Sequence, residues 1–382
     1  MLFRSDFAKF RAICDEIGAF LMADIAHPAG MAIAGAYPNP IDYADVVTFT
    51  THKTLMGPRA AVILTTNGKY ATKINNAVFP GEQGGPHMNT IAALSVAFHL
   101  AQTESFKALQ HKIVANAKLL ADEFKKLGLR LSYGGTDTHL LLIDLKGLKG
   151  KNGELLYGEP AATILETAGI VLNKNTIPGD EMTPLATGLR LGTPWFTQRG
   201  AGESEIKELA RLIHKTLTNI EPFHYQYSAR IQPRGKIDLR VMREISEETA
   251  ALAARLRIEP ATTHGYPHYP YLDEPLASTM LKLTGDKAEA FLQHVVAADL
   301  TKLGDQPLAA LVLDQDGTVI DEIAVARLPK AENPRRDGFM LRANKENLAQ
   351  LLPWLRGLSE GWLHFDADIT AKLDGPVVLS QV

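Results

Sequence analysis

Three short apolar segments near the beginning of the sequence constrain the fold more than any other feature. They cover residues 19–25, 45–51 and 60–66. An amphipathic helix is predicted over residues 6–17, because Asp6 is a candidate N-cap and Gly18 a candidate C-terminal glycine. A helix followed by short, continuously apolar strands is typical of an α/β sheet covered on both faces. We therefore expect an α/β fold.

Four polar side chains follow the first two apolar segments. Asp24 and His27 come at the end of the first, and His52 and Lys53 at the end of the second. Ligands of α/β sheets bind beyond the carboxyl ends of the strands. A lysine there can form a Schiff base, and pyridoxal phosphate also needs a carboxylate on its pyridinium nitrogen. Lys53 with Asp24 therefore suggests such a site, although a single lysine is most often a solvent-exposed loop residue.

Composition excludes several classes of partner. The chain has 382 residues and a formal net charge of −3, which gives no electrostatic reason to expect nucleic acid or anionic lipid. Its apolar segments are too short to span a bilayer, and the N-terminal residues lack the apolar stretch of a signal peptide. With Cys14 as the only cysteine, no intrachain disulfide is possible. We expect a cytoplasmic protein that binds neither a membrane nor nucleic acid, and no pattern indicates a metal site.

Cys14 lies on the apolar face of the first predicted helix. That face consists of Phe7, Phe10, Cys14 and Ile17 at helical spacing. Free cysteine is among the most often buried residue types. We expect this face to pack in the core.

Residue composition and hydrophobic pattern divide the rest of the chain into predicted helices, strands and loops. A glycine-rich loop covers residues 79–86, and helices are predicted over 87–102, 105–127, 161–167, 203–218 and 238–256. Strands are predicted over 140–145, 170–172 and 186–191. Residues 260–275 carry four prolines and three tyrosines, which a helix or central strand does not tolerate. We interpret that stretch as a linker or wrapping loop.

Five segments together resemble the serine hydroxymethyltransferase family. They are residues 23–30 (ADIAHPAG), 50–59 (TTHKTLMGPR), 79–86 (FPGEQGGP), 173–178 (NKNTIP) and 187–194 (TGLRLGTP). Their order and spacing agree with the family from residue 1 to about residue 230. Agreement in order and spacing is more specific than any one motif.

The resemblance implies a role for each candidate at the two strand ends. Lys53 would form the Schiff base with pyridoxal 5'-phosphate, and Asp24 would pair with its pyridine nitrogen. His27 would hydrogen-bond near the cofactor's phenolic oxygen and the substrate. His52 would lie beside the Schiff base and the phosphate.

Other matched positions would bind the phosphate, the substrate and folate. Gly84 and Gly85 would offer backbone N–H groups to the phosphate of a neighbouring subunit. Arg190 would bind the amino-acid carboxylate through its planar guanidinium. Arg59 would lie near the site, and Asn175 would contact tetrahydrofolate, the co-substrate.

The resemblance also implies a domain organisation. Residues 1–104 would be the C-terminal part of an aspartate-aminotransferase-like (fold type I) large domain, and 105–257 the small α+β domain. Residues 258–277 would be a linker. In the family, about two-fifths of the chain precedes the helix that begins this sequence. We therefore expect exposed sheet edges and little activity from this chain alone. The family forms homodimers or tetramers, and a separate chain could supply the absent region.

Residues 278–382 resemble a different family, the folate-binding domain of the glycine cleavage T-protein (aminomethyltransferase). The matching segments are residues 281–293, 298–303, 313–322, 339–344 and 352–355. Asp321 and Glu322 stand where that family has two aspartates, which makes them candidates for a second folate site. Asp314 and Asp316 precede Gly317 and predict a hairpin turn. The alternative for this segment is a scaffold without catalysis.

The sequence therefore predicts a transferase of one-carbon metabolism. It would interconvert serine plus tetrahydrofolate with glycine plus 5,10-methylenetetrahydrofolate. An aldolase of the same fold is one alternative, against which residues 173–178 argue. A non-catalytic folate-binding or assembly protein is the other.

Overall fold

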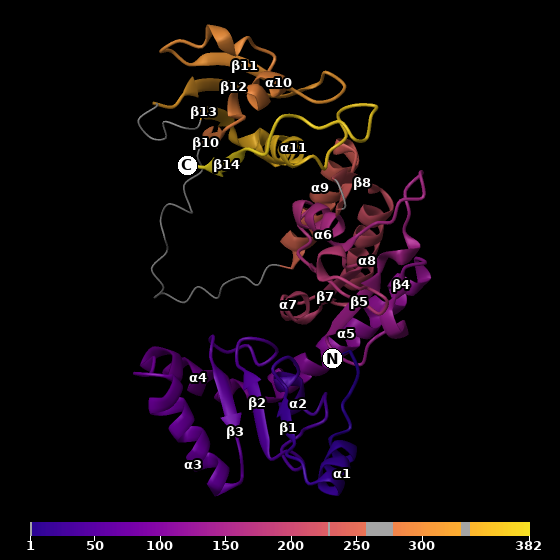
Figure 1. Ribbon diagram of the computed structural model, residues 1–382, viewed down its shortest axis with the longest axis vertical. Coiled ribbons are helices and arrows are strands. Elements are labelled where there is room, and N and C mark those ends of the chain that lie inside the picture. The colour runs from indigo at the N-terminus through magenta and orange to yellow at the C-terminus, as the bar shows by residue number, and fades with distance from the viewer. Residues whose placement is uncertain (1, 228–229, 257–277, 330–336) are drawn as a thin grey trace. The chain divides into compact units, whose positions relative to one another are not determined.

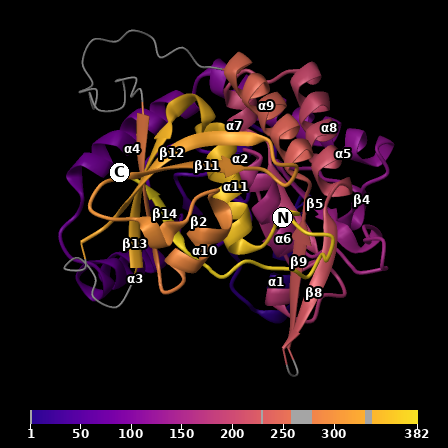
Figure 2. The same ribbon diagram turned by 90° about the horizontal axis from the view of Figure 1, so that it is seen from above.

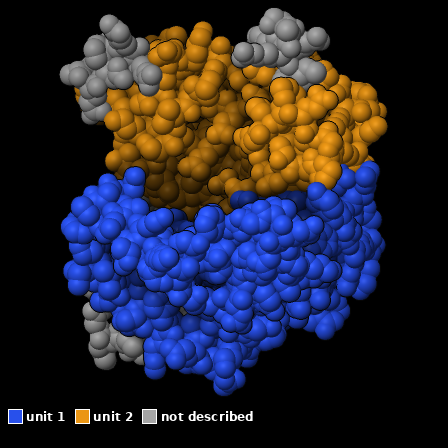
Figure 3. All heavy atoms as spheres, turned by 60° about the horizontal axis from the view of Figure 1, so that its bottom comes forward, with its two compact units in different colours: residues 1–144, 190–211, 254–258 blue, residues 145–189, 212–253, 259–382 orange. Residues whose placement is uncertain are grey.

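The computed structural model describes residues 2–227, 230–256, 278–329 and 337–382 (Figure 1). The predicted linker, residues 258–277, lies outside these ranges. The chain divides into two compact units, coloured separately in Figure 3. Unit 1 comprises Met1–Asp144, Arg190–Arg211 and Ala254–Ile258; unit 2 comprises Leu145–Leu189, Leu212–Ala253 and Glu259–Val382. The domain boundaries proposed from the sequence stay a prediction.

A three-stranded sheet forms the centre of the first part of unit 1. Helix α1 (Phe7–Ile17) leads into β1 (Met22–Asp24), β2 (Val46–Thr50) and β3 (Ala61–Leu64). Strand β1 is parallel to β2, pairing Met22 with Val46 and Asp24 with Thr48, whereas β3 is antiparallel to β2. The mixed α/β character is therefore as expected.

The expectation that both faces of this sheet are covered is wrong. In β2, Val47 and Phe49 are buried while the residues between them are partly exposed, and in β3 Ile63 and Leu64 are exposed. Alternating burial is the pattern of a strand with one covered face. An apolar strand sequence does not by itself decide how many layers cover it.

The prediction that the apolar face of α1 packs in the core is also wrong, although the predicted N-cap and C-terminal glycine of the helix are correct. Asp6 accepts a hydrogen bond from the backbone N–H of Lys9, and Gly18 ends the helix with a φ of 67°. Phe7 is buried, but Phe10 and Ile17 are 52% and 70% exposed and Cys14 is only half-buried.

The orientation of α1 follows from two contacts, made by Phe7 and Arg11. The ring of Phe7 meets that of Tyr37 with centroids 6.5 Å apart. The Arg11 guanidinium donates to the Asp45 carboxylate at 2.9 Å. Phe7 and Arg11 are four residues apart and share one side of the helix, so this side packs on the unit, and the part of the apolar face with Phe10 and Ile17 does not.

The further helices of unit 1 are α2 (Ala29–Ile33), α3 (Gly68–Asn76), α4 (Met88–Ala101), α5 (Glu104–Lys126) and α7 (Pro194–Gln198), with an irregular π-helical turn at Ala77–Glu82. Among them, α4 and α5 agree closely with the predicted ranges 87–102 and 105–127, whereas α2, α3 and α7 were not predicted. Helix α5 buries one long face, and on it Asn116 donates to the hydroxyl of Thr197 in α7 at 2.9 Å. Strand β4 (Arg130–Leu131) pairs antiparallel with β5 (Leu140–Asp144).

Unit 2 begins with an α+β segment. It contains α6 (Gly158–Thr167), β6 (Asn173–Asn175), β8 (Glu221–Tyr227), β9 (Arg230–Lys236) and most of α9 (Leu239–Arg255). Strand β7 (Gly188–Gly192) and helix α8 (Glu203–Thr218) are divided between the two units. The strand predicted at 170–172 lies instead at 173–175, because Ile170 and Leu172 are buried by packing without joining a strand.

Residues 278–382 form a five-stranded antiparallel sheet with strand order β11-β12-β13-β10-β14. The strands are β10 (Ser278–Gly285), β11 (Leu308–Leu313), β12 (Val319–Arg327), β13 (Asp337–Asn344) and β14 (Val378–Gln381). Helices α10 (Ala288–Val295) and α11 (Leu348–Glu360) pack against it (Figure 2). The predicted hairpin turn is confirmed: Asp314 accepts from the N–H groups of Asp316 and Thr318, and Gly317 has a φ of 80°.

Within unit 2 this C-terminal segment contacts the β8–β9 hairpin. The buried Lys236 ammonium donates to the carbonyl of Ala371 at 2.7 Å and lies over the rings of Phe223 and Phe365. The backbone N–H of Ile237 donates to the carbonyl of Trp362. A buried lysine held by a carbonyl and two rings joins the two parts through polar as well as apolar contacts. In the described ranges, no helix combines the length and apolar character that crossing a membrane requires.

Candidate functional site

The parallel pairing of β1 and β2 brings Asp24 and the segment 50–54 to one edge of the sheet. Asp24 is the last residue of β1 and pairs with Thr48, two residues before β2 ends at Thr50. The backbone continues this alignment, because Ile25 donates to the carbonyl of Thr48 at 2.9 Å. The prediction that these two strand ends meet is confirmed.

Lys53 is carried by a loop that closes on itself. The hydroxyl of the buried Thr51 donates to the carbonyl of Pro58 at 2.5 Å, and the N–H of Gly57 donates to the carbonyl of Thr51 at 2.8 Å. Met56 adopts a φ of 62°, which turns the chain back. Lys53 itself is half-buried and forms no ion pair with a carboxylate within the described residues. A free amine on a fixed loop is the geometry that Schiff-base formation needs.

Thr54 joins this loop to the segment after β1. Its hydroxyl accepts from the N–H of Gly30 at 3.0 Å and donates to the carbonyl of His27 at 2.5 Å. The buried Gln110 amide of α5 donates to the carbonyl of Thr54 at 2.8 Å. A Cβ on Gly30 would lie 2.2 Å from that same carbonyl oxygen, so only glycine allows this approach. The two candidate segments are therefore held together as one piece.

His27 stacks on His139, a residue that the sequence reasoning missed. The ring centroids are 5.5 Å apart at an interplanar angle of 27°, and Nδ1 of His27 lies 3.4 Å from Nε2 of His139. His139 is 4% exposed and directly precedes β5. The only sequence signal was a polar segment, residues 136–139, before an apolar strand. That signal says nothing about a partner 112 residues away.

Both histidines are held in the neutral form. Burial, followed by the positive charges of Lys53 and Arg190, lowers the pKa of His27 to about 4, although the Asp24 carboxylate opposes this. Burial, followed by His27, Arg190 and Lys53, lowers the pKa of His139 to about 3. Desolvation and nearby cations both disfavour imidazolium. Lys53, Arg190, Asp24 and the two histidines therefore share one electrostatic environment.

Three groups at this edge keep binding capacity for a ligand. Among the described residues Arg190, half-buried in β7, forms no ion pair, and the buried Nδ1 of His52 finds no hydrogen-bond partner. The exposed Asp24 carboxylate accepts the Ala26 N–H through one oxygen, Oδ1. These three groups, together with the Lys53 amine, fit the oxygen acceptors, the pyridinium nitrogen and the aldehyde of pyridoxal phosphate.

The remaining candidates lie elsewhere. Arg59 is exposed in the loop before β3. Gly84 and Gly85 are exposed, and in the described part of the chain no atom lies within 4 Å of a Cβ built on either. The structure does not bring these glycines into contact with the Asp24–Lys53 edge of their own chain.

Asn175 ends β6 in unit 2, in a loop fixed by Asp180. The Asp180 carboxylate accepts from the N–H of Ile177, the N–H of Thr187 and the hydroxyl of Thr187 at 2.9, 2.9 and 2.5 Å. Despite its burial, these hydrogen bonds and that to Lys146 lower the pKa of Asp180. The loop of residues 173–178 is therefore anchored by a carboxylate that is ionised at neutral pH.

Asp321 is buried in β12, whereas the adjacent Glu322 is exposed. The Asp321 carboxylate accepts from both N–H and side-chain amide of Asn344, at 3.0 and 2.8 Å. It also accepts from the Asn347 amide at 2.7 Å and from the N–H of Glu322 at 2.9 Å. The Asp321 carboxylate thus accepts four hydrogen bonds from groups of its own chain. The sequence could not reveal this, because three of the four donors come from Asn344 and Asn347, which only the fold brings close.

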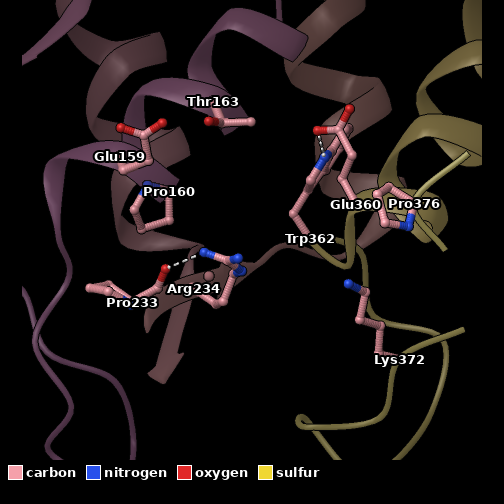
Figure 4. A pocket seen from close by; sticks show the side chains of 10 residues that line it. Glu159, Pro160, Thr163, Pro233, Arg234, Glu360, Trp362, Lys372 and Pro376 are labelled. Atoms are coloured by element: carbon pink, nitrogen blue, oxygen red, sulfur yellow. Dashed lines mark hydrogen bonds between the residues drawn. The ribbon is translucent and has the colours of Figure 1, made fainter. Parts of the chain in front are cut away.

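Unit 2 also contains a hollow of about 360 Å³ (Figure 4). It is lined by residues of α6, β9 and the chain around and beyond the end of α11, including Glu159, Arg234, Trp362 and Lys372. Trp362 donates to Glu360 at 3.0 Å, and Arg234 to the carbonyl of Pro233 at 3.1 Å. None of the predicted site residues lines it, so this hollow is not the predicted cofactor site.

Comparison with known families gives an independent result. The family model of serine hydroxymethyltransferase matches residues 3–213, more than half of the 382 residues. The match contains the strand ends with Asp24 and Lys53, and it extends beyond Arg190. The chain therefore belongs to the serine hydroxymethyltransferase family.

Proposed function

We propose that the Asp24–Lys53 edge is the pyridoxal-phosphate site of a serine/glycine hydroxymethyltransferase. The family uses pyridoxal phosphate as cofactor and tetrahydrofolate as co-substrate. The observation that carries the proposal is the alignment of Asp24 and Lys53 on adjacent parallel strands, with Thr54 joining the two segments. The reaction would interconvert serine plus tetrahydrofolate with glycine plus 5,10-methylenetetrahydrofolate.

Each side chain has a task that its environment supports. When bound, the cofactor supplies the electron sink for breaking a bond at the amino-acid α-carbon. Lys53 would hold the cofactor through its amine. The Asp24 carboxylate would hold the pyridine nitrogen and favour its protonated form. Arg190 orients the substrate carboxylate, because its guanidinium has no competing carboxylate in the described residues. His27, neutral at physiological pH, can donate one hydrogen bond and accept another.

The anchored loop around Asn175 favours a folate-dependent reaction over a folate-independent aldolase. Asp180 holds residues 177 and 187 from one carboxylate, which fixes the backbone between them. A preorganised loop binds a ligand without a large ordering cost. Asn175 would contact tetrahydrofolate from this loop.

We also infer that the site is completed in an assembly of this chain with a second copy. The family is generally oligomeric. Gly84 and Gly85 present bare, exposed backbone, and apolar side chains of α1 and α4, among them Phe10, Ile17 and Met88, are exposed in unit 1. Exposed apolar side chains in such numbers are typical of a protein that associates with a partner. Gly84 and Gly85 would serve the phosphate of the neighbouring copy.

For residues 278–382 the contacts favour a scaffold role over a second folate site. Asp321 would need a free oxygen to bind a pterin or amine nitrogen, and its carboxylate already accepts four hydrogen bonds from the chain. Glu322 alone remains exposed. A buried carboxylate that accepts four hydrogen bonds from its own chain stabilises the fold.

The experiment compares Lys53→Ala with Lys69→Ala, a matched change of an exposed lysine at the start of α3. Reconstituted with pyridoxal phosphate, the unchanged chain and Lys69→Ala should show the visible absorption band of lysine-bound cofactor. Lys53→Ala should lose it. Borohydride reduction followed by peptide mapping should place the cofactor on Lys53. A band that survives in Lys53→Ala, or a label on another lysine, would contradict the proposal.

A further inference from the structure

The buried ring of His139 lies against His27 with one nitrogen facing its partner and the other facing the protein. Nε2 lies 3.4 Å from Nδ1 of His27. Nδ1 is buried and has no hydrogen-bond partner among the described residues. The two nitrogens of this ring are therefore not equivalent.

We propose that His139 is a positioning residue that fixes the tautomer of His27: its Nε2–H donates to Nδ1 of His27, so that His27 carries its own proton on Nε2. The hydrogen-bonding geometry rests only on unit 1. Its consequence for a bound cofactor rests on the proposed function.

The first step of the argument is the number of protons in the pair. Two nitrogens that face each other at 3.4 Å can share one proton, as donor and acceptor, only if the rings are not both charged. Burial and the cations Lys53 and Arg190 keep both rings neutral at physiological pH, although the Asp24 carboxylate opposes this at His27. Each ring therefore carries one proton, and one of the two facing nitrogens must be bare.

The second step decides which nitrogen is bare. If His139 carried its proton on Nδ1, a buried N–H would have no acceptor in the described chain. Orphaned buried N–H groups are rarer in proteins than orphaned acceptors. With the proton on Nε2, the N–H is used and only a lone pair remains unpaired. The Nε2–H tautomer of His139 is therefore favoured, and it makes Nδ1 of His27 the acceptor.

The consequence is a defined donor at the candidate site. His27 follows β1 on the segment that Thr54 holds through its carbonyl, so its backbone is fixed as well as its ring. With Nδ1 occupied, the only proton of the ring is on Nε2. His27 would then act as a hydrogen-bond donor to an oxygen of the cofactor or substrate, and could not accept a proton from it at Nε2.

The experiment measures the tautomer directly by NMR on the chain without cofactor. Long-range ¹H–¹⁵N spectra of ¹⁵N-histidine-labelled protein distinguish protonated from bare ring nitrogens, and His27→Gln identifies the His27 signals. We expect His27 to hold its proton on Nε2, with the other tautomer populated roughly tenfold less or lower.

Two substitutions of His139 test the cause. His139→Leu removes the donor, and His27 should become a mixture of tautomers. His139→Gln places an amide N–H near the position of Nε2, and the single tautomer should return. His111→Gln is the control, because the His111 ring lies on the same unit but contacts the carbonyl of Ala34.

The outcomes separate this inference from the proposed function. A wild-type His27 protonated on Nδ1, or a tautomer ratio that His139→Leu leaves unchanged, would overturn the inference. If either His139 variant fails to fold, the wild-type spectrum alone still decides. The visible absorption band of bound cofactor tests the role of Lys53 separately. A chain without that band can still show the predicted His27 tautomer, and a chain with the band can lack it.

Discussion

The hydroxyl of Thr54 is the smallest group on which the geometry of the candidate site depends. It is 1% exposed and connects the N–H of Gly30 with the carbonyl of His27. Thr54→Val keeps the shape of the side chain and removes both hydrogen bonds. The Gly30 N–H then remains buried without its acceptor, because a methyl group takes the place of the oxygen.

The expected size of this effect follows from the contact that is lost. A buried donor left without a partner costs about 1–3 kcal/mol, so exchange of the Gly30 amide proton through local opening should accelerate by roughly 5- to 150-fold. Thr54→Ser is the matched control. It keeps the hydroxyl and loses one methyl group, worth about 0.8 kcal/mol, so its acceleration should be about fourfold at most.

NMR-detected hydrogen exchange at Gly30 measures the difference, with amides of α8 as an internal reference. The visible cofactor band should also form more slowly in Thr54→Val, since the loop that carries Lys53 is no longer joined to the segment after β1. Equal exchange rates at Gly30 in the Val and Ser variants would refute the assigned role of the hydroxyl.

Two further predictions concern pH and the C-terminal sheet. The pKa values of His27 and His139 are lowered to about 4 and about 3 from 6.5, so the unfolded chain binds protons that the folded chain does not. The free energy of unfolding should therefore fall as pH drops from 6.5 to about 4, in urea titrations, and fall less in His139→Gln; a pH-independent stability in this range would contradict the shifts. Asp321→Ala should destabilise the C-terminal sheet by at least about 2 kcal/mol, whereas Glu322→Ala should change it by about 0.5 kcal/mol or less, and equal losses on thermal unfolding would rule out the structural role of Asp321.

Local features were predictable because their causes lie within a few residues. Asp6 and Gly18 limit α1 as expected, and the Asp314–Gly317 turn forms through its own side chain. Caps and turns depend on short-range hydrogen bonds and on the φ angles that glycine allows. The strands that end near Asp24 and Lys53 could also be predicted, because short apolar segments indicate strands. Ligands of α/β sheets bind beyond the strand ends, which made the residues there candidates for the site.

The errors arose where burial is decided by distant partners. The more apolar face of α1, with Phe10 and Ile17, is exposed because Phe7 and Arg11 meet Tyr37 and Asp45. Periodicity shows that a helix has an apolar face, but the rest of the fold decides which face is covered.

The sequence by itself determined the family segments, the lysine and the carboxylate of the candidate site. The tertiary structure alone decided which groups surround them. His139 stacks on His27, although 112 residues separate them in the sequence. The Asp321 carboxylate accepts hydrogen bonds from the side-chain amides of Asn344 and Asn347. The physical reason is that desolvation and hydrogen-bond saturation belong to an environment, and an environment is made by residues that meet only when the chain folds.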